Sequence, residues 1–287
     1  MATTSELRRL LSLVHFDARL SCIEGLTAFR NLLEQDSDGS VLRFLNQELP
    51  KLDGKKRGGI AYVLAEHHRQ TGNLKSLQQL YADDDIEVKA SVLNALWGQP
   101  GSNPEMSPGI MQLAMDGANH ASPRVRMEAC SVFQNLCGWK VDVSGAVAPL
   151  HRLLSDDSDC VRSQAACAVG NLAKVKYDMS EHVAQLGQNA RREDISVRNY
   201  SAWALWQISR NKHDIGVAVP ELVQLLADND DWNDPRKNAV GALLHHAKKS
   251  SQNREQVMQC IKMVQLDLKY KKYKEIRRLE EGLASLS

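Results

Sequence analysis

The sequence predicts an all-α fold, a right-handed α-solenoid of about seven helical hairpins followed by a C-terminal capping helix pair. A Val-Arg or similar pair recurs, with apolar or small residues 4, 7, 8 and 11 positions after its first residue. The copies are 32 to 38 residues apart, and polar, acidic turns separate the helical patterns between them. Such a step is typical of repeats that bury their apolar faces on their neighbours. The basic residues of the motif are Arg19, Arg57, Lys89, Arg126, Arg162, Arg198 and Arg236.

Each repeat is expected to be a helix, a turn and a second helix that carries the motif. The clearest copy runs from Val161 to Leu172, and its apolar residues follow helical spacing. First helices are expected at 7–14, 41–49, 74–81, 110–115, 146–154, 182–189 and 217–227. The repeats lie near 5–33, 38–70, 73–97, 106–138, 144–174, 179–210 and 215–250, and the cap at 253–286.

One segment interrupts what is otherwise expected to be a single solenoid domain over residues 1–287. Residues 98–109 contain three prolines and three glycines, which cannot continue a helix. The segment is either a long loop between repeats or a hinge between the third and fourth repeats.

Acidic clusters recur in the turns, at 83–85, 156–159 and 228–231. Carboxylate and amide groups accept hydrogen bonds from the free N–H groups that open a helix, and their charge favours that end. The clusters recur at one structural position and lack the spacing of a calcium loop. We therefore expect helix caps, and no metal site is predicted from them.

The composition excludes several classes of protein. The net charge is +1, so the chain as a whole is not drawn to nucleic acid or anionic membranes. No stretch approaches the roughly 18 apolar residues of a membrane span, and the apolar run at 10–16 is too short and interrupted for a secretory signal. The six cysteines include no C-x-x-C pair, which favours reduced thiols in a cytoplasmic protein.

The repeats resemble the HEAT and armadillo superfamily. The acidic turn, the Val-Arg pair and the small-residue helix resemble bacterial HEAT repeats of the phycobilisome-lyase type, and the segments 164–173 and 201–209 resemble armadillo third helices. The resemblance covers about residues 5–250 and implies HEAT-like hairpins whose second helices line a concave face. It implies no single activity, because this architecture serves scaffolds, transport receptors, lyases, hydroxylases and DNA repair enzymes.

Side chains 3, 6 and 10 positions after the start of the motif are expected on that concave face, beside the buried stripe of the second helix. Asn135, Asn171 and Gln207 occupy equivalent positions, and carboxamides can both donate to and accept from an extended peptide backbone. Trp203 matches the armadillo tryptophan by resemblance, whereas Cys167 one repeat earlier does not. The predicted concave row comprises Glu128, Asn135, Gln164, Asn171, Tyr200, Trp203, Gln207, Asn238 and His245.

Motifs of the common enzyme classes are missing from the sequence. It contains no G-x-S-x-G, Walker loop or G-x-G-x-x-G. The His-Glu dipeptides of HEAT-type di-iron hydroxylases are also missing, and only the reversed pairs at 66–67 and 181–182 occur. A HEAT-like DNA glycosylase, with Trp203 and Glu128 as aromatic and carboxylate, stays an alternative, as does a bilin lyase on resemblance alone. No cofactor, no metal site and no catalytic residue are predicted.

The leading functional prediction is a non-enzymatic module that binds a protein or peptide on its concave face, as a scaffold, an assembly factor or an immunity-type protein. The aromatic side chains favour this, because such residues concentrate at interaction hot spots. Nucleic acid is the alternative partner, although phosphate binding needs more positive charge than the concave row offers. A basic patch in the cap is the other candidate surface for it: Lys269, Lys271, Lys272, Lys274, Arg277 and Arg278. A membrane partner is not expected, and the oligomeric state stays open.

Overall fold

The computed structural model describes residues 3–14, 24–97, 103–139, 141–226, 234–263 and 274–286. Every regular element in these ranges is a helix, so the predicted all-α class is confirmed. The chain divides into two compact units, residues 1–139 and 140–287. The division does not fall in the predicted hinge segment, of which residues 98–102 lie outside the described ranges. A single solenoid over the whole chain stays a prediction.

The first unit consists of helical hairpins that alternate shorter and longer helices. In this unit α4 packs on α2 and α6, and α6 packs on α8, so the motif-bearing helices form one layer. Its elements are α1 (Thr4–Ser12), α2 (Glu24–Glu34), α3 (Ser40–Glu48), η1 (Leu49–Lys51), α4 (Gly54–Gln70), α5 (Leu74–Tyr81), α6 (Ile86–Ala95), η2 (Pro104–Met106), α7 (Ser107–Gly117) and α8 (Pro123–Gly138).

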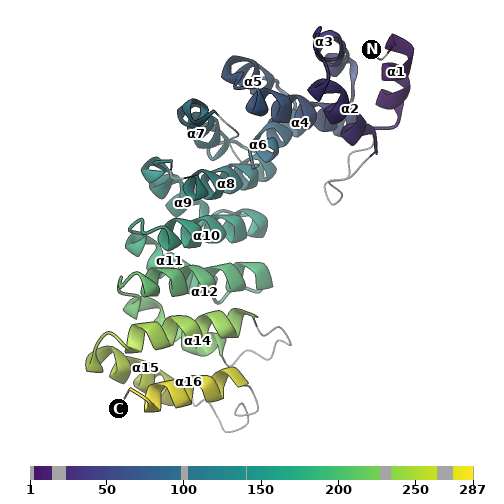
Figure 1. Cartoon of the computed structure of the whole chain (residues 1–287). Coiled ribbons are helices and arrows are strands. Elements are labelled where there is room, and N and C mark those ends of the chain that lie inside the picture. The colour runs from purple at the N-terminus through teal and green to yellow at the C-terminus, as the bar shows by residue number, and fades with distance from the viewer. Residues whose placement is uncertain are drawn as a thin grey trace. The chain divides into compact units, whose positions relative to one another are not determined.

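The second unit repeats a short first helix, opened by a 3-10 turn, and a longer second helix. Figure 1 shows the second helices α10, α12 and α14 side by side, and the terminal helix α16 beside α14. Its elements are η3 (Ser144–Ala146), α9 (Val147–Leu153), α10 (Asp159–Lys174), η4 (Ser180–His182), α11 (Val183–Asn189), α12 (Ile195–Arg210), η5 (Gly216–Ala218), α13 (Val219–Leu225), α14 (Asp234–Ala247), α15 (Ser251–Met263) and α16 (Lys274–Ala284).

The apolar stripe of the motif forms the core of each unit. On α10, Val161, Ala165 and Leu172 are fully buried, as the helical spacing predicts. On α8, Val125 and Leu136 occupy the same positions as Val161 and Leu172 and are also fully buried. The remaining accessible positions on these helices are the ones that the motif does not specify.

Of the three predicted acidic turns, the one at 83–85 caps its helix as expected. The Asp85 carboxylate accepts a hydrogen bond from the Glu87 amide at 2.8 Å. Asp194, which lies outside the three predicted clusters, caps α12 in a similar way and accepts from the Val197 amide at 2.9 Å. In the turn at 156–159, Asp156 accepts from the Ser158 amide at 3.0 Å, a bond within the turn. The N-cap residue Ser158 makes no side-chain capping bond to α10, so the predicted cap is not formed at this turn. The turn at 228–231 lies outside the described residues. The caps at Asp85 and Asp194 satisfy amides that the helix itself leaves without partners.

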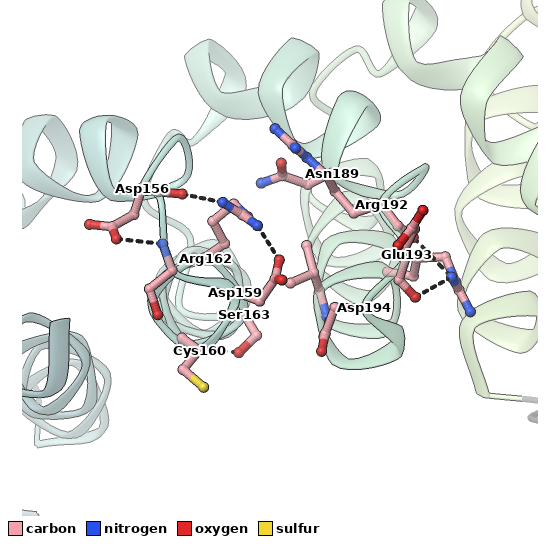
Figure 2. A network of polar contacts seen from close by, with 12 residues as sticks. Asp156, Asp159, Cys160, Arg162, Ser163, Asn189, Arg192, Glu193 and Asp194 are labelled. Atoms are coloured by element: carbon pink, nitrogen blue, oxygen red, sulfur yellow. Dashed lines mark hydrogen bonds and ion pairs between the residues drawn. The ribbon is translucent and has the colours of Figure 1, made fainter.

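The basic residue of the motif binds the backbone of the turn that precedes its helix (Figure 2). Arg162 donates to the Asp156 carbonyl and pairs with the Asp159 carboxylate. One repeat later, Arg198 donates to the carbonyls of Arg192 and Glu193 at 2.9 and 2.8 Å. The motif cation therefore satisfies backbone carbonyls of the turn between the two helices, and it fixes this turn to the second helix.

The capping pair ends the second unit. Buried residues of α16, among them Ile276 and Leu279, belong to its apolar face, and Gly282 lies directly against the Leu244 side chain of α14. Arg254 of α15 donates to the Leu286 carbonyl, which ties the two terminal helices together. No described helix in either unit is long and apolar enough to cross a membrane.

Candidate functional site

The second helices of unit 140–287 expose one narrow stripe, which we call the second-helix face. Its residues are half-buried or exposed, while the positions between them on the same helices are mostly buried. On these helices the face therefore contains the positions that the sequence predicts for the concave row, except that of Gln207, which is buried. It also contains Trp206 and one cation per helix. Its residues are Gln164, Cys167, Asn171 and Lys174 on α10; Tyr200, Trp203, Trp206 and Arg210 on α12; and Asn238, Gly241, His245 and Lys248 on α14.

Both tryptophans of this face pack against glycines on neighbouring helices. A Cβ atom on Gly170 would overlap the ring atoms Cζ3 and Cε3 of Trp203. A Cβ atom on Gly241 would lie 2.8 Å from Cε2 of Trp206. Glycine has no side chain, so each ring can lie against the backbone of the next helix. Both rings thus join adjacent repeats, and each keeps a half-exposed edge on the face.

The carboxamides of the face differ in how far they are available to a partner. The Asn171 amide donates to the Cys167 carbonyl of its own helix at 3.0 Å. Asn238 donates across helices to Asn199 Oδ1 at 2.8 Å. Gln207 is only 5% exposed, so the predicted third carboxamide of the row is covered by its surroundings.

Positive charge gathers at the carboxyl ends of α12 and α14. The Arg210 guanidinium lies 5.8 Å from the centre of the Trp206 ring, within cation–π range. Burial lowers the pKa of His245, and the nearby Lys248 and Arg210 lower it further, so this imidazole is neutral at pH 7. Burial also raises the pKa of Tyr200, which keeps its hydroxyl protonated. The ionised side chains at this end of the face are therefore cations.

The predicted concave residues of the first unit have a different setting. Glu128 is 8% exposed and accepts a hydrogen bond from Asn94 at 3.0 Å, and burial raises its pKa. Asn135 is half-buried and donates to the Ser131 carbonyl of its own helix at 2.8 Å. Glu128 and Trp203, imagined together in a glycosylase, belong to different units.

The basic patch of the cap is only partly described. Lys274, Arg277 and Arg278 are exposed on α16, where Glu280 and Glu281 are exposed as well. The acids interrupt the positive charge of this helix. Lys269, Lys271 and Lys272 lie outside the described residues.

Sequence reasoning missed one cluster of potential metal ligands, on the first-helix side of unit 140–287. His151, Glu181 and His182 each offer a ligand atom, and these atoms all lie within 4.8 Å of one another. The reversed Glu-His pair was visible in the sequence, but His151 lies 30 positions before Glu181. Only the packing of consecutive repeats brings them together.

Comparison with known proteins identifies the fold. No family model matches the sequence, and no curated protein matches it. An engineered protein solved by crystallography is 19% identical, with a TM-score of 0.62, over 98% of this chain and 79% of that one. A designed armadillo repeat protein in complex with the peptide (KR)4 is 19% identical, with a TM-score of 0.57, over 74% of this chain and 98% of that one.

A further crystal structure, of computationally designed armadillo repeat proteins for modular peptide recognition, is 20% identical, with a TM-score of 0.56. It covers 73% of this chain and 98% of that one. At these identities the likeness concerns the fold. The chain therefore has the all-α helical-repeat fold of these designed armadillo solenoids.

Proposed function

We propose that this protein is a non-catalytic binding module whose second-helix face receives an extended, acidic segment of a protein partner. The observation that carries the proposal is the charge of that face. No aspartate or glutamate occurs in the sequence over 163–177, 195–213 or 235–254, which include the face of all three helices. Within the same ranges, Lys174, Arg210 and Lys248 are exposed at equivalent repeat positions.

The three cations follow one another from helix to helix, as carboxylates would along an extended peptide. Ion pairs at a solvated surface each contribute little affinity, but complementary charge sets orientation, selects partners and speeds association. The repeat spacing therefore favours a linear acidic segment over a single compact anion.

Aromatic and carboxamide groups supply the remaining contacts. Tyr200 and Trp203 are half-buried, so each has lost part of its mobility before a partner arrives while its accessible edge can still form contacts. Gln164 has a carboxamide on the same stripe and can bind a peptide backbone group. These residues favour a peptide that carries apolar side chains between its acidic ones.

The designed neighbours support peptide binding in general. The peptide bound by one of them has the opposite charge to the peptide that we propose for this chain. One of them is in complex with the strongly basic peptide (KR)4. A surface lined by cations opposes such a ligand, since like charges placed together cost affinity. We therefore propose that this chain binds a peptide in the same mode, but that its peptide is acidic. We propose that this binding serves a scaffold or assembly role in the cytoplasm.

A direct experiment compares two peptide probes of equal length. Fluorescence anisotropy would measure the binding of a labelled Glu-Leu repeat peptide and of (KR)4 to the full chain. We expect the acidic peptide to bind more tightly, and the charge-reversal variant K174E/R210E/K248E to invert the preference. The variant R152E/R191E/R192E makes the same change of charge on exposed residues of the first-helix side, and it should leave the preference unchanged.

Two results would contradict the proposal. If both peptides bound equally, or if the control variant inverted the preference, the second-helix face would not be the surface that selects the peptide. A single-stranded oligonucleotide serves as the third probe, because cations also attract phosphate. If it displaced the acidic peptide and its affinity fell steeply with salt, nucleic acid would replace the proposed partner.

A further inference from the structure

We propose that His151, Glu181 and His182 form a binding site for a divalent transition-metal ion, with zinc as the first candidate. His151 lies on α9, and Glu181 and His182 lie in η4, which opens the first helix of the following repeat. One ligand atom of each residue lies within 4.8 Å of the others. A small movement of the two exposed side chains, His151 and Glu181, would bring all three to bonding distance.

The two imidazoles already have the separation that a shared ion requires. Their ring centroids are 5.3 Å apart, and the ring planes meet at 76°. Imidazoles bound to one tetrahedral zinc, with Zn–N bonds of about 2.0–2.1 Å, have ring centroids about 5 Å apart. The pair is therefore preorganised for ligation rather than stacked face to face.

A hydrogen bond determines which nitrogen of His182 can bind the ion. His182 Nε2 lies 3.2 Å from the Val147 carbonyl oxygen. A carbonyl only accepts, so Nε2 bears the proton and Nδ1 presents a lone pair. His182 is fully buried, and its Nδ1 has no hydrogen-bond partner.

Such an orphaned nitrogen is unusual in a protein interior, because buried polar atoms are almost always hydrogen-bonded. A ring whose second nitrogen donates to a backbone carbonyl is also the arrangement in which metal-binding histidines are commonly held. An ion bound to Nδ1 would satisfy this atom without changing the hydrogen bond to Val147.

The donor set selects the class of ion. Two imidazole nitrogens and one carboxylate are typical ligands of zinc in sites that leave the fourth position to water or another ligand. Magnesium and calcium prefer sets made only of oxygen atoms, so these ions fit less well. Because His151 and Glu181 are exposed, the ion can enter from solvent and meet the fixed His182 ring.

Bound zinc would join the first helices of two consecutive repeats. The ligands come from different hairpins, so the complete site exists only in the folded chain. A ligand that binds the folded state alone raises the melting temperature. This property provides a readout that does not depend on the partner of the second-helix face.

The test is a titration of the untagged full chain with Zn²⁺ in competition with a chromophoric chelator. The exposed thiol Cys160 is replaced by serine in every variant, because it is another possible zinc ligand. We expect one high-affinity ion per chain and a higher melting temperature with zinc. H151A and E181Q change exposed side chains, so both should fold. Each removes a direct ligand, so the affinity should fall by at least the roughly 10–100-fold that loss of an outer-shell partner costs, and the thermal shift should be lost.

The matched control is H67A, which removes a half-buried histidine in the first unit. It should bind zinc and respond thermally as the parent chain does. Co²⁺ should give the intense visible absorption of a four-coordinate ion, and H151A should lose it. The proposal is overturned if the parent chain takes up no zinc, if H151A binds it with parental affinity, or if Co²⁺ gives only a weak six-coordinate spectrum.

Discussion

Replacing Gly170 with alanine tests whether the Trp203 ring sets the approach of α10 and α12. The added methyl carbon would overlap two ring carbons, at distances below the 3.0 Å under which real Cβ contacts essentially never occur. Overpacking of this kind costs about 1–3 kcal/mol. Alanine in a helix is favoured over glycine by about 1 kcal/mol, which acts in the opposite direction. In the parent chain, G170A should therefore reduce the free energy of unfolding by about 0–2 kcal/mol.

The effect should change sign when the ring is removed. In a W203A background the three atoms nearest to the added methyl group, all in the Trp203 ring, are gone. The helix-propensity term of about 1 kcal/mol then dominates, and G170A should stabilise the chain. The difference between the two backgrounds is the coupling energy of the pair. It should equal the overpacking cost, about 1–3 kcal/mol.

The assay is urea unfolding of the four chains of this cycle, followed by circular dichroism. G138A is the matched control, because no atom lies within 4 Å of the added Cβ at the end of α8. It should be neutral or stabilising, by up to about 1 kcal/mol. If G170A had the same effect with and without Trp203, within about 0.5 kcal/mol, the proposed contact would not exist in solution.

Three further predictions concern stability and reactivity. R198M should lower the free energy of unfolding by about 1–3 kcal/mol for each carbonyl left without a donor, as measured by urea unfolding. The control R191M changes an exposed residue and should alter this free energy by less than about 0.5 kcal/mol. Burial raises the pKa of Glu128 above its value of 4.5, so the folded chain holds this proton more tightly and loses stability as pH rises from 4.5 through the raised pKa. E128Q should therefore stabilise the chain at pH 7 and reduce the fall of the unfolding free energy with rising pH. Urea unfolding measured across this pH range would contradict the prediction if E128Q and the parent chain had the same pH dependence. Burial raises the pKa of Cys167 to about 11, so iodoacetamide at pH 8 should label exposed Cys160 first, and peptide mass spectrometry showing equal labelling would contradict this.

The repeat motif by itself determined the fold class and the buried stripe. A Val-Arg pair followed by apolar residues at fixed offsets specifies one face of a helix, and helical periodicity is a local property that a sequence displays directly. Val161 and Leu172 are buried for this reason. The acidic cap at Asp85 could be predicted for the same reason, because its carboxylate bonds to an amide only two positions away.

The same periodicity indicated which positions of the second helices lie outside the buried stripe. It could not indicate how far neighbouring repeats cover the side chains at those positions. Gln207 and Asn171 occupy one repeat position, yet Gln207 is nearly covered while Asn171 is half-exposed. Exposure depends on side chains contributed by neighbouring repeats, and these differ from one repeat to the next.

Tertiary structure alone decided the contacts between residues that are far apart in the sequence. Trp203 meets Gly170, and His151 meets His182, because consecutive hairpins stack and bring positions about one repeat apart into contact. The position of the His182 proton likewise depends on the Val147 carbonyl of the preceding repeat. The sequence determined the helices and their buried faces through local spacing, whereas the surroundings of the second-helix face and the histidine cluster required the packing of one repeat on another.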